Sequence, residues 1–186
     1  IYVELLEKLG PTSFVGYDTL ECGAIVNALI CDGEVAERLE AGQEGEIILS
    51  TTPFYAEMGG EVGDTGIIFA GESVARVLDT KAPEAGLTVH KVKIESGSFS
   101  VGEEVTASVD AKRRASIARN HTCTHILHAA LREVLGAHVK QAGSYVGPDR
   151  LRFDFTHFEA LTPEQIAQVE ELANSYIMQA IPTTRY

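Results

Sequence analysis

Hydrophobic and polar residues alternate in short runs from Thr12 to about Asp110. The runs are rich in β-branched and aromatic residues and are separated by glycine and acidic residues, a pattern typical of β-strands joined by tight turns. Since no helical segment separates the runs, we expect a small antiparallel β-barrel, closed or nearly closed, which avoids exposed sheet edges. The predicted strands are Ser13–Asp18, Ala24–Cys31, Gly45–Ser50, Gly66–Ala70, Ser73–Thr80, Thr88–Glu95 and Glu103–Asp110.

After Asp110 the apolar positions are spaced three and four residues apart, which predicts a helix with one inward face. Asp110 can cap the N-terminus of this helix, and Gly136 can end it. The positions on the predicted inward face are Ile117, His121, Thr124 or His125, His128, Leu131 and Leu135.

Two alternating segments and a second helix follow. His138–Val146 and Leu151–Phe155 are predicted strands, joined by a Gly-Pro-Asp turn at 147–149. Thr162 and Gln165 can form a capping box around Pro163, which predicts the start of the second helix. The expected fold class is therefore α+β, a barrel followed by a helix, a β-hairpin and a helix.

The expected division of the chain has three parts. Residues 1–11 are interpreted as the end of a preceding helix with a linker, 12–109 as the barrel domain, and 110–186 as the N-terminal half of a second, truncated domain. The chain opens at Ile1 within a helical pattern and ends at Tyr186 directly after another. We interpret it as an internal fragment of a longer protein.

The charge of the chain limits its partners. A formal net charge of −12 over 186 residues argues against non-specific nucleic-acid binding, because an acidic surface repels phosphates. Any RNA contact must be local. One basic patch exists, although such a patch is more often a solvated helix face, and it consists of Lys112, Arg113, Arg114 and Arg119.

The cysteines Cys22, Cys31 and Cys123 show no CxxC spacing, so neither a disulfide framework nor a self-contained zinc knuckle is predicted. No apolar run is long enough for a transmembrane helix, and the N-terminus lacks the pattern of a signal peptide. These features favour a cytoplasmic protein.

The sharpest chemical feature is the pair His121 and His125 in the sequence His-Thr-Cys-Thr-His. Histidines at positions i and i+4 of a helix lie on the same face and can share one metal ion, for which zinc is the natural candidate. Two ligands are too few for a complete zinc site, and Thr122 stands where a metalloprotease motif has its glutamate. The alternative, two satisfied structural histidines, stays open at this point.

A second feature is the glycine-rich segment that contains Gly59, Gly60 and Gly63. Glycines allow tight turns and a close approach of another chain or of a phosphate. The segment lacks the Lys-Ser/Thr of a P-loop, so ATP binding is not predicted here. Taken alone, it could equally be a glycine-rich hairpin of the barrel.

Four blocks occur in a fixed order and together resemble alanyl-tRNA synthetase. They are residues 52–66, Arg113-Arg114 with 120–132, 139–144 and 151–157. The resemblance runs from about Gly16 to the C-terminus. Small departures occur at Met58, Glu61 and Cys123, where the family more often has a small residue, glutamine and alanine.

The resemblance implies a translation-factor-like barrel and the first half of an editing domain. The parent enzyme attaches alanine to tRNA(Ala) with ATP in a separate catalytic core, and its editing domain hydrolyses Ser-tRNA(Ala) and Gly-tRNA(Ala). His121 and His125 would be two of four zinc ligands, the other two coming from a downstream CxxxH motif that this chain does not contain. We therefore expect an incomplete metal site and a fragment that is inactive by itself.

The resemblance also implies roles for further residues. Thr124 and Gln141 match the residues of the catalytic pocket, and Gly59, Gly60 and Gly63 match the motif that positions the acceptor end of tRNA(Ala). Phosphate contacts are expected from Arg113, Arg114 and Arg119. An unfinished sheet leaves an open edge, so self-association of the fragment is also expected.

Two alternatives remain. The first is a fragment of a stand-alone editing protein that acts on mischarged tRNA in trans. The second is a non-enzymatic tRNA-binding β-barrel module in which the histidines are structural.

Overall fold

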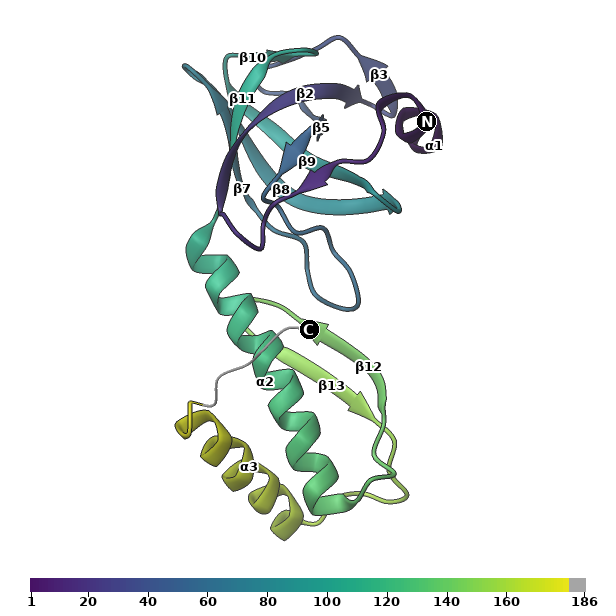
Figure 1. Ribbon diagram of the computed structural model, residues 1–186, viewed down its shortest axis with the longest axis vertical. Helices are drawn as coiled ribbons and strands as arrows, with labels where there is room; N and C mark the ends of the chain where they lie inside the picture. The colour runs from purple at the N-terminus through teal and green to yellow at the C-terminus, as the bar shows by residue number, and fades with distance from the viewer. Residues whose placement is uncertain (181–186) are drawn as a thin grey trace. The chain divides into compact units, whose positions relative to one another are not determined.

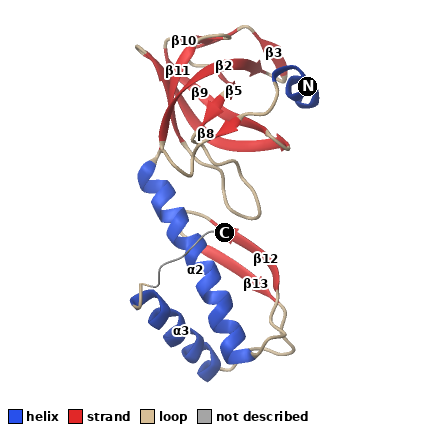
Figure 2. Ribbon diagram, in the orientation of Figure 1, coloured by secondary structure: helices blue, strands red, loops and turns tan. Residues whose placement is uncertain are grey.

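The computed structural model describes residues 1–180, which fold into an α+β protein with two compact units. The first unit comprises residues 1–58 and 62–114, and the second comprises 59–61 and the chain from Ala115 onward. Figure 2 shows the contrast between them: the first is almost entirely strand with one short helix, whereas the second contains the long helices and a hairpin. The expected fold class is confirmed.

The first unit is a closed six-stranded antiparallel barrel (Figure 1). Its strands follow the order β11-β7-β8-β9-β5-β2, and the barrel closes because β11 also pairs with β2. Short strands form further pairs in this unit. Strand β3 pairs with β2 and β10 pairs with β4, both antiparallel, and β1 runs parallel to β6. The strands are β1 Ser13–Phe14, β2 Glu21–Cys31, β3 Glu34–Ala36, β4 Arg38–Glu40, β5 Glu44–Leu49, β6 Thr51–Thr52, β7 Gly66–Ala70, β8 Ser73–Glu84, β9 Leu87–Ser96, β10 Ser98–Ser100 and β11 Glu104–Val109.

Alternate residues of these strands point into the barrel and form its core, as the two-residue period of a strand requires. One tight hairpin lies between β2 and β3, where Asp32 and Gly33 form a two-residue loop with φ of 51° and 82°. Two consecutive positive φ angles are typical of the Asp-Gly turn that matches the twist of the strands. Core residues with no exposed surface include Leu29, Leu39, Ile47, Leu49, Phe54, Ile68 and Phe99.

One predicted strand of the barrel is mostly wrong. Only Ser13–Phe14 of the predicted strand Ser13–Asp18 is a strand, because the amide of Asp18 donates to the carbonyl of Val15 and closes a turn. Gly16 lies within this turn, where a Cβ would be 2.2 Å from the carbonyl oxygen of Pro53.

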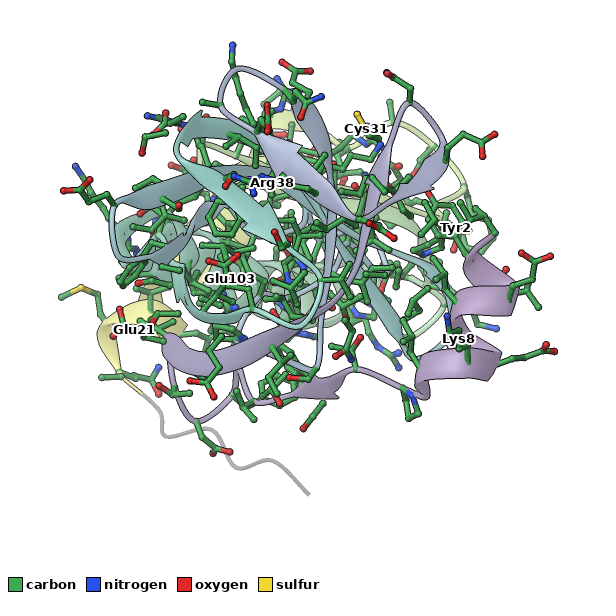
Figure 3. The ribbon with its side chains drawn as sticks, turned by 90° about the horizontal axis from the view of Figure 1, so that it is seen from above. Tyr2, Lys8, Glu21, Cys31, Arg38 and Glu103 are labelled. Atoms are coloured by element: carbon green, nitrogen blue, oxygen red, sulfur yellow. The ribbon has the colours of Figure 1, made fainter. Side chains whose placement is uncertain are left out.

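Helix α1 (Tyr2–Leu9) lies against the outside of the barrel, as Figure 3 shows for the helix that carries Tyr2 and Lys8. Leu5 is its buried residue and packs in a second apolar cluster with Ile48 and Leu87 of the barrel wall. The hydroxyl of Tyr2 donates to Glu46 at 2.8 Å, and this bond raises the pKa of Tyr2.

The second unit is built on helix α2 (Ala111–Leu135), of which Ala115 onward belongs to this unit. The hairpin β12 (Gln141–Val146) and β13 (Leu151–Phe155) and helix α3 (Pro163–Met178) pack against it (Figure 1). Their shared core is centred on Ala130, Leu131, Val139 and Val169.

Three predicted helix boundaries are confirmed. The amide of Arg113 donates to the carboxylate of Asp110 at 2.9 Å, Gly136 ends α2 with a φ of 116°, and Thr162 and Gln165 form the capping box of α3. Within residues 1–180, no helix is both long enough and apolar enough to cross a membrane.

The predicted start of β12 is wrong by three residues. The strand begins at Gln141 and not at His138, because the amide of Val139 bonds back to the carbonyl of Gly136 in a turn. Val139 is fully buried in the core of the second unit, which holds this turn in place.

Candidate functional site

The two predicted zinc ligands lie one turn apart on α2 with their rings face to face. The ring centroids of His121 and His125 are 5.1 Å apart and the ring planes differ by 23°. Both residues are exposed on the helix, with half of the His121 side chain accessible. The pair is therefore open to solvent and to a ligand, unlike a satisfied core pair.

Sequence reasoning missed the partner of this pair. A carboxylate oxygen of Glu61 lies 2.5 Å from Nδ1 of His121, although the two residues are 60 positions apart in the chain. The Glu61 side chain is only 12% exposed, so its carboxylate is largely shielded from water although His121 is half exposed. The sole hint in the sequence is the departure of Glu61 from the residue that the related family more often has.

Glu61 is held there by a short extension of the hairpin sheet. It forms a parallel bridge with Val146 of β12, and the amide of Val146 donates to the carbonyl of Gly60 at 2.8 Å. The hydroxyl of Ser144 donates to the carbonyl of Gly59 at 3.3 Å. The segment Gly59–Glu61 thus runs beside β12 as an added edge.

Glycine is required at position 60 by both conformation and space. Gly60 has a φ of 90°, and a Cβ there would lie 2.3 Å from the backbone oxygen of Ser144. Gly59 also has a positive φ, 61°, but a Cβ there would meet nothing within 4 Å. The close approach of two backbones, which the glycine motif predicted, occurs here between Gly60 and β12.

The donor set of the histidine pair fits part of a zinc site. Imidazole nitrogen is an ordinary zinc ligand, and a histidine ligand usually has its second ring nitrogen bonded to a carboxylate or a carbonyl. Glu61 occupies that second position on His121. Among the described residues, however, no third His, Cys, Asp or Glu completes a group that could hold a metal ion.

Thr124 lies on the same helix between the two histidines and is 7% exposed. Its hydroxyl donates to the carbonyl of Asn120, four residues earlier, at 2.9 Å. Asn120 in turn donates from its amide to the carbonyl of Gly147 at 2.7 Å, which ties α2 to the turn of the hairpin. The hydrogen of the Thr124 hydroxyl is therefore used, and its oxygen keeps lone pairs with which it can accept.

Gln141 is exposed at the first position of β12, where it pairs with Phe155 of β13. No hydrogen bond among residues 1–180 joins its amide to the histidine pair. Its predicted catalytic role stays a prediction.

Arg114 is part of a buried network in the first unit. Its guanidinium forms an ion pair with Asp64, which is 2% exposed, and also donates to the carbonyls of Gly16 and Pro53. The same carboxylate accepts from the amide of Tyr55 at 2.7 Å. Its donors are directed at protein acceptors, which gives Arg114 a structural role in the first unit, and its predicted phosphate contact stays a prediction.

Arg113 and Gly63, two other residues of the predicted RNA contact, are brought together in the first unit. The guanidinium of Arg113 donates to the carbonyl of Gly63 at 2.8 Å. A Cβ at Gly63 would lie 2.2 Å from the carbonyl oxygen of Thr80, so this glycine is required by packing against β8. The remaining arginine, Arg119, is exposed on α2 and bonds to Ser116.

The other histidines contact residues other than His121 and His125. His128 packs on Phe153, and His138 bonds to His157 at 2.9 Å. His90 is buried in the barrel, where Thr52 and the carbonyl of Ile47 satisfy its two nitrogens. These bonds give His90 a structural role in the barrel.

Comparisons with known proteins support the resemblance to alanyl-tRNA synthetases. A family model described as "tRNA synthetases class II (A)" matches residues 2–113. Over 186 residues, all of this chain and 21% of the relative, the chain is 46% identical to an alanine–tRNA ligase of Pelotomaculum thermopropionicum. It is 51% identical over 176 residues to an alanine–tRNA ligase of Acetivibrio thermocellus, which covers 95% of this chain and 20% of the relative. The chain thus spans about a fifth of the length of these relatives.

Proposed function

Since this chain belongs to the family of class II tRNA synthetases (A), we propose that it is the barrel and the first part of the editing module of an alanyl-tRNA synthetase. The module hydrolyses Ser-tRNA(Ala) and Gly-tRNA(Ala), and the parent enzyme makes Ala-tRNA(Ala) with ATP at a site outside this chain. The proposed activity is exercised in the cytoplasm, where tRNA is charged.

One observation carries the proposal: the glycine-rich segment and the HxxxH helix meet at a contact between Glu61 and His121. Neither motif alone has a specific function. Together they form one polar, solvent-open cluster in the second unit, beside Thr124. A metal-dependent hydrolytic site combines metal ligands with a polar group that can recognise the substrate.

The chemistry explains why a second site is needed. A binding pocket for the methyl group of alanine rejects glycine poorly and rejects the added hydroxyl of serine only moderately, so a separate hydrolytic site supplies the missing discrimination. In the complete module, a zinc ion bound by His121 and His125 would polarise the ester or its attacking water. We expect two further ligands from a CxxxH motif outside this chain.

Thr124 is the residue we propose for recognising serine. Its hydroxyl hydrogen is donated to the carbonyl of Asn120, so its oxygen is left to accept a hydrogen bond from the hydroxyl of a seryl group. Glycine and alanine have no hydroxyl to donate. Gln141, on the neighbouring strand β12, is proposed to help position the same acceptor end.

We propose that tRNA contacts come from Arg113 and Arg119 and from the backbone around Gly59 and Gly60. Arg119 is exposed, and backbone amides in glycine-rich turns can bind phosphate. The acidic net charge of −12 limits such contacts to a few residues and favours an ordered acceptor end over non-specific RNA binding.

The experiment that tests this proposal measures deacylation of Ser-tRNA(Ala), Gly-tRNA(Ala) and Ala-tRNA(Ala). The protein is this chain extended at its C-terminus through the next CxxxH motif, with Thr124→Val as a variant that keeps the shape and removes the hydroxyl. We expect hydrolysis of the two mischarged tRNAs, and a selective loss of Ser-tRNA(Ala) hydrolysis in Thr124→Val. Equal hydrolysis of all three substrates by both proteins would contradict the role of Thr124, and no hydrolysis at all would contradict editing.

A further inference from the structure

We propose that Glu61 is a positioning residue for metal binding: its carboxylate holds His121 in the tautomer that carries hydrogen on Nδ1 and so presents a bare Nε2 to the metal ion. The inference rests on the proposed function, because it assigns His121 as a ligand. It adds a residue that acts through His121 and does not itself touch the metal.

The bond between Glu61 and His121 determines which ring nitrogen of His121 carries the hydrogen. Nδ1 of His121 and Oε2 of Glu61 are 2.5 Å apart. An ionised carboxylate can only accept a hydrogen bond, so Nδ1 must be the donor. A neutral imidazole carries a single ring hydrogen, and Nε2 is therefore left with its lone pair, the form that binds metal.

Of the two residues in this bond, Glu61 is the one held in place by its surroundings. Glu61 is only 12% exposed, whereas His121 is 50% exposed. The backbone of Glu61 is bridged to Val146, and the preceding carbonyl of Gly60 accepts from the amide of Val146. The hairpin therefore holds the carboxylate, and the carboxylate in turn holds the exposed ring of His121.

The bond to Glu61 also affects the direction in which Nε2 of His121 points. Nδ1 and Nε2 flank Cε1 of the imidazole ring and point in different directions, so the bond from Nδ1 to Glu61 leaves Nε2 directed away from this carboxylate. The ring then lies within 5.1 Å and 23° of the ring of His125, measured between centroids and planes. Two imidazoles in this arrangement are already oriented before a metal arrives, which lowers the entropic cost of binding.

Direct ligation by Glu61 is the competing assignment. It is disfavoured because the carboxylate is already at hydrogen-bonding distance from His121, and because the described residues contain no group of three metal-binding side chains. In the arrangement seen here, Glu61 supports a ligand as carboxylates commonly support zinc-bound histidines.

The test uses this chain with Glu61→Ala, with Glu61→Gln, and with Glu57→Gln as the matched control. Glu57 lies in the same glycine-rich region, but it is paired with Lys81 in the first unit. The first measurement is the tautomer of His121, read from its ring nitrogen shifts by NMR in metal-free protein at pH 8. We expect the Nδ1–H form in the parent and the control, a weaker preference in Glu61→Gln, and the ordinary Nε2–H preference in Glu61→Ala.

The second measurement uses the same variants in the chain extended through a CxxxH motif, because the chain by itself holds only two of the expected ligands. It is the affinity for Zn²⁺, obtained by competition with a chromophoric chelator, together with the absorption spectrum of bound Co²⁺. Loss of a carboxylate behind a histidine ligand typically weakens metal binding by roughly 10–100-fold, and we expect Glu61→Ala to fall in this range. The Co²⁺ spectrum should keep its band positions, since the ligand atoms are unchanged.

Several outcomes would overturn the inference. They are an Nε2–H tautomer in the parent chain, Zn²⁺ affinity of the extended Glu61→Ala protein equal to that of the extended control, no Zn²⁺ binding by the extended parent protein, or a Co²⁺ spectrum that changes its ligand field in Glu61→Ala. None of these readouts uses deacylation. A protein that passes all of them and still leaves Ser-tRNA(Ala) intact would reject the editing proposal while the role of Glu61 stands.

Discussion

His90 is a fully buried histidine of the barrel with both ring nitrogens satisfied. The carbonyl of Ile47 can only accept, so Nδ1 carries the hydrogen, and Nε2 accepts from the hydroxyl of Thr52 at 2.7 Å. The ring of Phe54 meets it edge to face at 5.2 Å. Burial lowers the pKa of His90 from 6.5 to about 4, against a smaller opposite effect of the bond to Ile47.

The lowered pKa of His90 predicts a specific loss of stability in acid. Above pH 6.5 His90 is neutral in both the folded and the unfolded states, so its protonation does not lower the free energy of unfolding. As the pH falls from 6.5 to about 4, His90 is protonated in the unfolded chain but stays neutral in the folded barrel. The free energy of unfolding therefore falls by up to about 3 kcal/mol. Urea unfolding at pH 7, 5.5 and 4.5 should show this fall in the parent and not in His90→Gln. An NMR titration of His90 with a midpoint near 6.5 would contradict the prediction.

Gly59 and Gly60 offer a matched pair for the glycine-rich segment. Both have positive φ, but only at Gly60 would a Cβ meet the backbone of Ser144. We expect Gly59→Ala to lower the free energy of unfolding by about 1–2 kcal/mol through backbone strain alone, and Gly60→Ala by about 3 kcal/mol because the clash adds to it. Urea unfolding followed by the helical circular dichroism signal measures both. Equal losses would show that the contact with β12 contributes nothing.

At the scale of elements, helix α2 carries arginines with different tasks. Arg114 neutralises the buried Asp64, and Arg119 is exposed. Removing one partner of a buried ion pair leaves an uncompensated charge, so we expect Arg114→Gln to lower the free energy of unfolding by about 3–5 kcal/mol. Arg119→Gln should change it by no more than about 0.5 kcal/mol.

Arg114→Gln and Arg119→Gln also distinguish a residue that stabilises the fold from a residue that contacts RNA. Loss of a phosphate contact should weaken binding of the tRNA(Ala) acceptor stem and reduce the salt dependence of log Kd by about one unit. We expect this from Arg119→Gln, measured by fluorescence anisotropy over a range of salt concentrations. An unchanged salt slope would remove Arg119 from the tRNA contact.

Elements with local signals were predictable, and those that depend on distant partners were not. The caps Asp110 and Thr162 follow from side chains within three residues of the helix start, and their hydrogen bonds form as expected. The strand pair β4–β10 joins Phe99 to Leu39, 60 residues apart, so no local pattern announces it. The bond between Glu61 and His121 was unpredictable for the same reason.

The site shows the same limit at the level of single side chains. Spacing on a helix was enough to bring His121 and His125 together, since residues four apart share a face. It could not show that Arg114 would be directed at Asp64, because the sequence gives the charge of a side chain but not the burial of its neighbour.

At the scale of the whole molecule, the hairpin sheet of the second unit leaves one edge unpaired in the described part of the chain. Glu61 bridges to β12, and β13 pairs only with β12 among residues 1–180. An unpaired strand edge is a template for pairing with another copy, so we expect weak, concentration-dependent dimers of this chain. Sedimentation velocity over a range of concentrations measures it, and a monomer at every concentration would contradict the prediction.

The central claim is that the histidine pair on α2 is part of a metal-dependent editing site. It is tested most directly by measuring zinc content and Ser-tRNA(Ala) deacylation for this chain and for the chain extended through a CxxxH motif, each with and without His121→Ala. The account predicts about one zinc ion and deacylation for the extended protein, and the loss of both in its His121→Ala variant. An extended protein that binds no zinc and leaves Ser-tRNA(Ala) intact would contradict it and favour a non-enzymatic tRNA-binding barrel.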